Sequence, residues 1–432
     1  MKSEIKSADG LVREIEIEVD AETVDAAFAE AYKKYSKEAK IKGFRPGKAP
    51  MSVIKSKFGD AIRDEVLDEL MEKSYPEAVK EQDLRVASAP MIPPNIELKE
   101  GSPLKYTAKV EVLPEIEKIN IEGLQLPEIE VEVRDPEVDA VVDYLRKKHA
   151  EIRPVEREAK EDDIIFADLT KTDDPDNVLE GDSFSDIEID LASDITVKEF
   201  KDSLPGIKPG EEREVSVSYP ADYNNKMLAG KSLKYLCKVK EVRERVLPPE
   251  NDAFAKQVDE EIETVLEMRM KIREDLKRQK EMDHSKWKSN EIQRQFLDKN
   301  QIDVPEAMIE RYINGMIEDF QKQKKEIDEK TAREQYRPVA VNSIRWTILT
   351  AKLAIDENIE VLPEDTEKWI KRFADNYNMD MEKAREVLSK SGRIQEIRDS
   401  ILDEKILDFL ITKVTYIPQE DFKKDNNITE EK

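Results

Sequence analysis

Helical periodicity runs almost without a break from Pro249 to about Tyr416. Apolar residues recur there at three- and four-residue spacing, as at Val258, Ile262 and Leu266. Only 12 of the 432 residues are glycine, under half the usual share of about 7%. We therefore expect an all-helical domain over residues 250–417. The polar residues 418–432 hold too little apolar material to pack and are expected to form a disordered tail.

The first 112 residues combine both kinds of periodicity. Ile15, Ile17 and Val19 alternate with glutamates, which is the pattern of a half-buried strand. Further elements are expected as helices over 21–41 and around 62–70, and as a strand over 105–112. Strands at both ends with helices between them predict an α+β domain over residues 1–112.

The middle of the chain changes to short strands and turns. Residues 113–150 are expected to form a proline-punctuated connector that carries one helix, and residues 151–249 a β-rich domain. The last strand of that domain alternates apolar residues with lysines, and Cys237 lies on its apolar side. No histidine lies nearby in the sequence, so we interpret Cys237 as a small buried side chain and not a nucleophile.

The composition of the chain argues against several classes of protein. Lys and Arg number 72 and Asp and Glu 98, so the net charge is −26, which argues against nucleic-acid binding by the whole chain. No apolar run approaches the length of a membrane span, and the N-terminus has no signal-peptide pattern. One cysteine suits a reducing cytoplasm, and two histidines make a metal site or a catalytic triad unexpected.

One window reverses this acidic balance. Residues 33–57 hold one acid, Glu38, and nine basic residues: Lys33, Lys34, Lys37, Lys40, Lys42, Arg45, Lys48, Lys55 and Lys57. The window therefore carries 9 − 1 = +8, and the rest of the chain −26 − 8 = −34. Charge separated this sharply is typical of a patch that binds a polyanionic partner.

A short loop lies at the centre of this window. It contains Gly43, Phe44, Arg45, Pro46, Gly47, Lys48 and Pro50. Two glycines permit left-handed backbone and two prolines stiffen the loop, so Phe44 is expected to point outward between cations. The alternative is a solvated basic turn without a partner.

The same residues carry a family resemblance. The pattern G-F-R-x-G-K-x-P, intact from Gly43 to Pro50, resembles the ribosome-binding signature of bacterial trigger factor, and the resemblance extends over the whole chain in length and domain order. It implies a cytoplasmic chaperone that docks on protein and RNA at the ribosomal tunnel exit and shelters nascent or unfolded polypeptides. No Walker-type loop is present, so neither a nucleotide nor another cofactor is expected, and no membrane partner.

The β-rich domain resembles the FKBP-like prolyl isomerase domain of that family. Tyr219–Tyr223 fits the family pattern, whereas Leu169 replaces the usual Phe and the glycine-rich stretch is not recognisable. The residues expected to line a prolyl pocket are Val197, Phe200, Tyr223 and Tyr235. The alternative is that these four side chains simply fill a small β core.

The helical domain carries a wide apolar face. Met308, Tyr312 and Met316 form one column at four-residue spacing; an isoleucine column lies beside it at positions 309, 313 and 317. One interpretation gives the isoleucines to the core and the Met–Tyr column to client chains, because Met adapts to varied apolar partners. The other is a core helix packed on two sides. An exposed column would also favour a weak homodimer off the ribosome.

Three functions therefore remain open. The leading hypothesis is an ATP-independent ribosome-associated chaperone that binds nascent polypeptides at the tunnel exit and assists their folding. The first alternative is chiefly a peptidyl-prolyl cis-trans isomerase with helical appendages that hold the substrate. The second alternative is an acidic scaffold that binds RNA directly through the basic loop.

Overall fold

The computed structural model describes residues 1–38, 44, 50–173, 183–193, 195–219, 229–323, 328–390 and 393–425. The chain divides into two compact units: one combines residues 1–129 with 286–432, and the other comprises residues 130–285. The middle of the sequence thus forms a unit of its own between two segments that fold together. The domain boundaries expected from the sequence remain a prediction.

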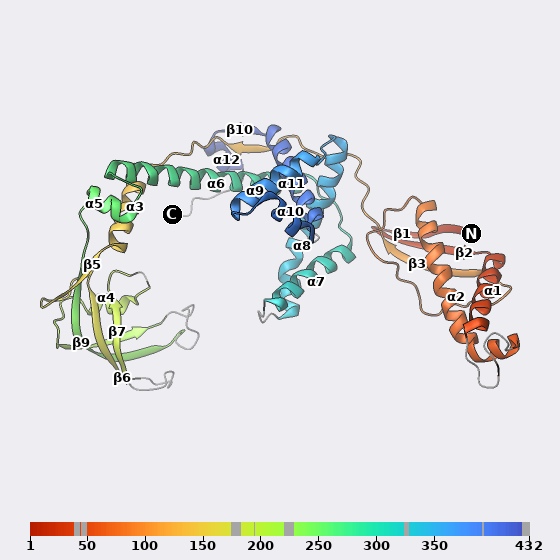
Figure 1. Cartoon of the computed structure of the whole chain (residues 1–432), viewed down its shortest axis with the longest axis horizontal. Coiled ribbons are helices and arrows are strands. Elements are labelled where there is room, and N and C mark those ends of the chain that lie inside the picture. The colour runs from red at the N-terminus through yellow and green to blue at the C-terminus, as the bar shows by residue number, and fades with distance from the viewer. Residues whose placement is uncertain are drawn as a thin grey trace. The chain divides into compact units, whose positions relative to one another are not determined.

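The N-terminal part of the first unit is a three-stranded antiparallel sheet covered by two helices (Figure 1). Its elements are β1 (Lys2–Asp9), β2 (Val12–Val19), α1 (Ala21–Glu38), α2 (Met51–Glu81) and β3 (Leu104–Glu111). In the central strand, Ile15 and Ile17 lie opposite Ala108 and Tyr106 of β3 and are buried against both helices. The alternation expected of β2 is confirmed, and β3 lies where a strand was expected over 105–112.

A capping residue fixes the start of α1. The Asp20 carboxylate accepts hydrogen bonds from the backbone N–H of Thr23 (2.9 Å) and from its hydroxyl (2.8 Å). These bonds lower the pKa of Asp20 to about 2. They satisfy one of the backbone donors that a helix leaves unpaired at its first turn.

The second unit contains a five-stranded sheet together with helices. Its elements are α3 (Asp135–Lys148), β5 (Glu151–Val155), β6 (Ile164–Asp173), β7 (Ser183–Asp190), α4 (Lys198–Ser203), β8 (Glu212–Ser218), β9 (Ser232–Val246) and α5 (Asp252–Val258). Strand β9 pairs with β5, β6 and β8, and β7 pairs with β6. Cys237 in β9 is fully buried, and burial raises the pKa of its thiol to about 11. Its interpretation as a small core residue is confirmed.

Helices make up most of the remaining chain. They are α6 (Val265–Lys299), which continues from the second unit into the first, α7 (Glu306–Lys322), α8 (Glu329–Asp356), α9 (Pro363–Asn376), α10 (Met381–Lys390) and α11 (Ile394–Thr412). One core joins α6, α8 and α11 around Phe296, Trp346 and Leu410. There the indole N–H of Trp346 donates to Asp403 at 2.9 Å, and burial raises the pKa of that carboxyl.

Two three-residue strands tie the connector to the end of the helical part. Strand β4 (Gln125–Pro127) pairs in parallel with β10 (Thr415–Ile417). Leu124 and Leu126 are fully buried in the core that contains Phe296 and Trp346. The first part of the connector, up to Pro127, is therefore part of the helical core and not a free linker.

The expectation of a disordered tail over residues 418–432 is wrong for the first part of that segment. Residues Gln419–Asp425 form helix α12, and Phe422 is only 2% exposed. Its ring packs edge-on against Trp287 at a centroid distance of 6.1 Å. This buried aromatic side chain contributes to the order of a segment whose composition is otherwise polar.

We expect α12 to stabilise the first unit measurably. Ending the chain after Ile417 should destabilise this unit by about 2 kcal/mol, the value of one buried Phe side chain, and should shift Trp287 fluorescence to longer wavelength. Ending it after Asp425 is the matched control and should change neither the melt nor the emission. Equal melts for the two truncated chains would show that α12 contributes nothing.

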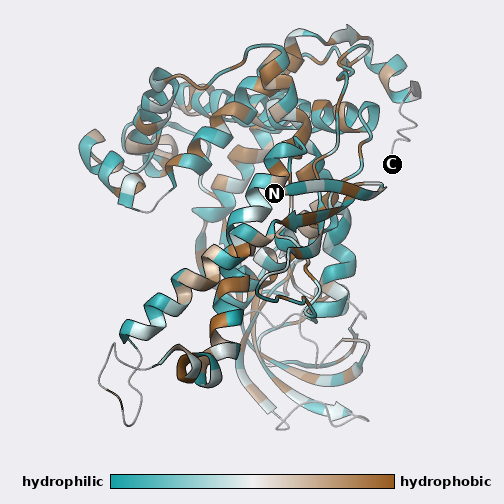
Figure 2. Ribbon diagram, turned by 90° about the vertical axis from the view of Figure 1, so that its right-hand side faces the viewer, coloured by the Kyte–Doolittle hydropathy of each residue, from teal (hydrophilic) through white to brown (hydrophobic). Residues whose placement is uncertain are grey.

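The described helices contain no long apolar runs. Figure 2 shows hydrophilic and hydrophobic residues interleaved along the helices. Within the described ranges, none of the helices combines the length and the apolar character that crossing a membrane requires.

Candidate binding surfaces

The basic loop lies between the end of α1 and the start of α2. Phe44 is described there and is 41% exposed. Pro50 directly precedes α2, and its carbonyl oxygen accepts from the backbone N–H of Val53 at 3.0 Å. The other expected loop residues, Gly43, Arg45, Pro46, Gly47 and Lys48, lie outside the described residues.

Two lysines of the basic window are paired inside the domain. Lys34 Nζ lies 2.5 Å from Glu65 Oε1, and Lys55 Nζ lies 2.6 Å from Glu100 Oε2. The net charge of +8 counted along the sequence therefore overstates the positive charge that is free to meet a partner. The acids that neutralise these lysines lie outside the window, so a count within it misses them.

Lys55 belongs to a small cluster that joins α1, α2 and the loop before β3. Its ammonium group lies 4.6 Å from the centre of the Tyr32 ring, and the Tyr32 hydroxyl donates to Glu100. Burial and then the Glu100 carboxylate raise the pKa of Tyr32 to about 12. Lys55 and then Tyr32 lower the pKa of Glu100. The cluster thus links α1, α2 and the loop before β3 through one ion pair and one hydrogen bond.

Three of the four expected prolyl-pocket residues meet in the core of the second unit. The rings of Phe200 and Tyr235 lie 6.2 Å apart, and Val197 packs against the same cluster. Phe200 is 8% exposed and Tyr235 4%. Tyr223 lies outside the described residues. Side chains so deeply buried leave little surface for a substrate, which favours the interpretation that they fill the β core.

The two columns of helix α7 differ in burial. Ile309, Ile313 and Ile317 are buried against Ala340 and Ile344 of α8. The other column, Met308, Tyr312 and Met316, is half-buried, and its first two members pack against the edge of the same core. The helix therefore presents its isoleucines to α8 and leaves a second, partly open apolar strip.

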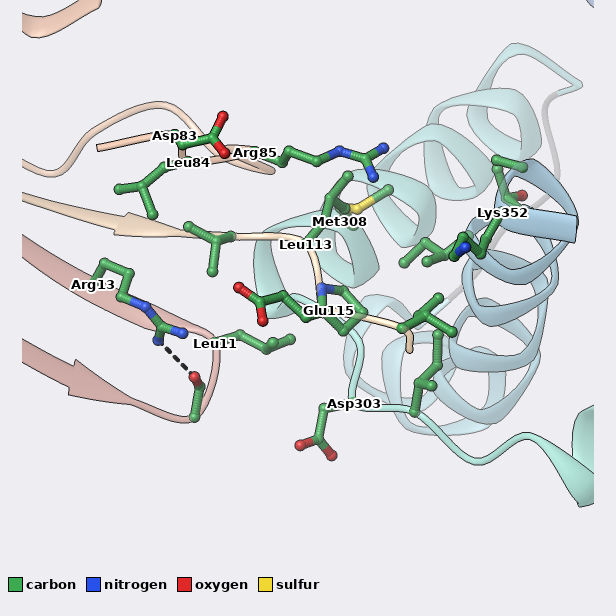
Figure 3. A pocket seen from close by; sticks show the side chains of 18 of the residues that line it. Leu11, Arg13, Asp83, Leu84, Arg85, Leu113, Glu115, Asp303, Met308 and Lys352 are labelled. Atoms are coloured by element: carbon green, nitrogen blue, oxygen red, sulfur yellow. Dashed lines mark hydrogen bonds between the residues drawn. The ribbon is translucent and has the colours of Figure 1, made fainter. Parts of the chain in front are cut away.

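A cavity of about 830 Å³ lies at the start of this strip. Figure 3 shows the residues that line this cavity. Met308 of α7, Leu113 of the connector and Lys352 of α8 are among them. Aliphatic side chains and both signs of charge share the wall, Arg85 and Glu115 among them. A cavity of this size and composition suits apolar side chains flanked by polar backbone.

Two polar contacts join α7 to the N-terminal α+β part beside this cavity. The Glu111 carboxylate accepts from the backbone N–H of Ala307 at 2.9 Å, where it meets the positive end of the α7 dipole. Arg311 donates to the carbonyl oxygen of Ala87, also at 2.9 Å. These contacts hold one wall of the cavity against the other.

Sequence reasoning found Met308 but not the cavity. Its lining comes from five segments: residues 10–13, 83–85, 112–116, 302–308 and 347–355. No local pattern links segments so far apart, and their meeting depends on the packing of the helical core. Among the described residues, no group of three or more His, Cys, Asp or Glu side chains is placed to hold a metal ion.

Family models match almost the entire chain in three consecutive parts. Residues 1–145 match the model of bacterial trigger factor protein, and residues 264–412 match the model of its C-terminus. Residues 155–243 match FKBP-type peptidyl-prolyl cis-trans isomerase.

Curated relatives match more than nine tenths of the chain. A trigger factor from Caldicellulosiruptor saccharolyticus is 33% identical over 420 residues, which are 94% of this chain and 95% of the relative. One from Koribacter versatilis is 30% identical over 414 residues, with 93% and 94% covered. A solved structure of the trigger factor chaperone superposes with a TM-score of 0.54 at 24% identity, covering 96% of this chain and 100% of that one. That superposition shows the common fold.

Proposed function

Because the chain belongs to the bacterial trigger factor family, we propose that it docks at the polypeptide exit of the ribosome and binds nascent chains without ATP hydrolysis. Membership in this family supports the general function of a ribosome-associated chaperone. Its partners are then the ribosome, through protein and RNA at the tunnel exit, and unfolded polypeptides.

The observation that carries the docking proposal is the position of Phe44. A large apolar side chain is 41% exposed at the centre of a window of charge +8, within a chain of net charge −26. An exposed aromatic group between cations is poorly placed for stability and well placed for a partner that offers both phosphates and an apolar contact.

Co-sedimentation of the full chain with ribosomes across a salt series tests this docking. We expect binding at low salt that weakens steeply as salt rises, because released counterions drive an electrostatic contact. Binding to naked RNA as tight as binding to ribosomes would favour the RNA-binding scaffold instead. No binding to ribosomes at any salt would refute docking.

We propose that unfolded client polypeptides bind to the partly open apolar strip of α7. Met308, Tyr312 and Met316 supply adaptable apolar contact, and the neighbouring cavity offers room for a side chain. Partial burial supports this, because fully buried residues would leave no surface and fully exposed ones would be poorly positioned.

We also propose that the prolyl isomerase activity is weak or absent. Phe200 and Tyr235 are buried, and Leu169 stands in the same core where the family pattern has Phe. The rotation barrier of an X-Pro bond falls only when a pocket encloses the proline. The rate of cis–trans conversion in a proline tetrapeptide measures this, with Phe200→Ala as the comparison. Turnover similar to that of an intact FKBP-type domain would contradict the proposal.

The remaining parts of the proposal follow from the same surfaces. The chain acts in the cytoplasm, where its ribosome partner is, and needs no cofactor. Its apolar strip favours a weak homodimer off the ribosome. Sedimentation equilibrium at rising protein concentration measures this association.

A further inference from the structure

From the ion pairs around the basic loop, we infer that its flanking lysines have two separate tasks. Lys33, Lys37 and Lys57 bind phosphates of an RNA strand at the docking site, whereas Lys34 and Lys55 hold the two helices together. This inference rests on the proposed docking to the ribosome and assigns its RNA contacts to particular side chains.

The paired lysines are occupied within the protein. Lys34 bridges α1 to Glu65 of α2, and Lys55 bridges α2 to Glu100 in the loop before β3. Hydrogen bonding to Lys34 lowers the pKa of Glu65, and hydrogen bonding to Lys55 lowers that of Glu100. A phosphate that approached either lysine would have to displace a carboxylate already in contact.

The other three described lysines are exposed and have no ion pair with any described residue. Lys33 and Lys37 are four residues apart on α1, so they share one face, opposite the buried Phe28 and Tyr32. Lys57 lies on α2 within its first two turns. All three are thus close in sequence to the ends of the loop that carries Phe44.

The spacing of these charges favours RNA over an acidic protein. Like charges four residues apart destabilise a helix when nothing neutralises them. Lys33 and Lys37 are separated by about 6 Å along the helix axis, similar to the distance between successive phosphates of an RNA strand. Lysine also binds phosphate as a flexible point charge and needs no fork geometry.

The test compares two sets of substitutions in the full chain. One replaces Lys33, Lys37 and Lys57 with Gln; the matched control replaces Lys34 and Lys55 with Gln. Both are measured with the wild type in ribosome co-sedimentation across a salt series. The first set should weaken binding at low salt by about tenfold or more and reduce the slope of log K against log salt by about 2 to 3, without changing the melt. The control should keep the slope and lower the melting temperature by about 1 to 3 °C.

Three outcomes decide the matter. A wild type that fails to bind ribosomes would refute the docking proposal itself. A wild type that binds, together with a first set that keeps its full slope, would overturn only the assignment of the lysines. Equal losses of slope in the two sets would overturn the division into two groups.

A photo-crosslink identifies the chemical class of the partner. Ala29 is exposed one turn before Lys33, and Cys237 is fully buried, so a benzophenone maleimide should label only the introduced thiol of Ala29→Cys. Crosslinks from this position to ribosomal RNA support the inference. Crosslinks to ribosomal protein alone would overturn it.

Discussion

Replacing Phe44, Arg45 and Lys48 together with Ala is expected to abolish co-sedimentation with ribosomes. The change removes an exposed aromatic side chain and two of the nine cations of the basic window. Phe44 is exposed, so the change at this position should alter the free energy of unfolding by no more than about 0.5 kcal/mol. Circular dichroism melts should therefore nearly superimpose on those of the wild type.

Helix α3 offers a matched control. Tyr144, Lys147 and Lys148 are exposed there, and replacing them with Ala also removes one aromatic side chain and two cations. This variant should bind ribosomes as the wild type does. Undiminished binding by the Phe44, Arg45 and Lys48 variant, or an equal loss in the control, would refute the assignment of the loop.

The two columns of helix α7 should respond to truncation in opposite ways. Changing Ile309, Ile313 or Ile317 to Ala should destabilise the fold by roughly 2–5 kcal/mol at each site, because each leaves a cavity against α8. Changing Met308, Tyr312 or Met316 to Ala should cost under about 1 kcal/mol each, near the value for surface positions. The triple variant of the second column should fold and lose its ability to suppress aggregation of an unfolded client.

Each column serves as the control for the other, since they share one helix and one periodicity. Thermal melts give the stability, and light scattering of a denatured client gives the chaperone activity. A large loss of stability in the Met–Tyr variant would place those residues in the core. Full chaperone activity in its folded fraction would also refute the client proposal.

The regular parts of this fold could be predicted because their patterns are local. The alternation of Ile15, Ile17 and Val19 and that of β9 around Cys237 fix which face of each strand is buried. Strand β4 and helix α12 could not be found in this way. Three residues are too few to show a period, and α12 packs on partners far away in the sequence, among them Trp287 and strand β4.

The candidate sites follow the same division. The loop around Phe44 has a local signature, so the sequence alone locates it. Whether a lysine near the loop forms an ion pair depends on residues far away in the sequence. Glu65 is 31 residues from Lys34, and Glu100 is 45 residues from Lys55. The cavity beside Met308 is the extreme case, because its five segments meet only in the folded chain.

The parallel pairing of β4 with β10 limits when this protein can complete its fold during synthesis. Strand β4 has no partner until Thr415 has been added, about 290 residues after Gln125. At about 5–20 residues per second, this delay lasts roughly 15 to 60 s. The N-terminal sheet needs nothing beyond β3 and can form early, whereas Leu124 and Leu126 stay uncovered until the final helices emerge. We therefore expect each new copy to expose these apolar residues for most of its own synthesis, when it is itself a substrate for a chaperone.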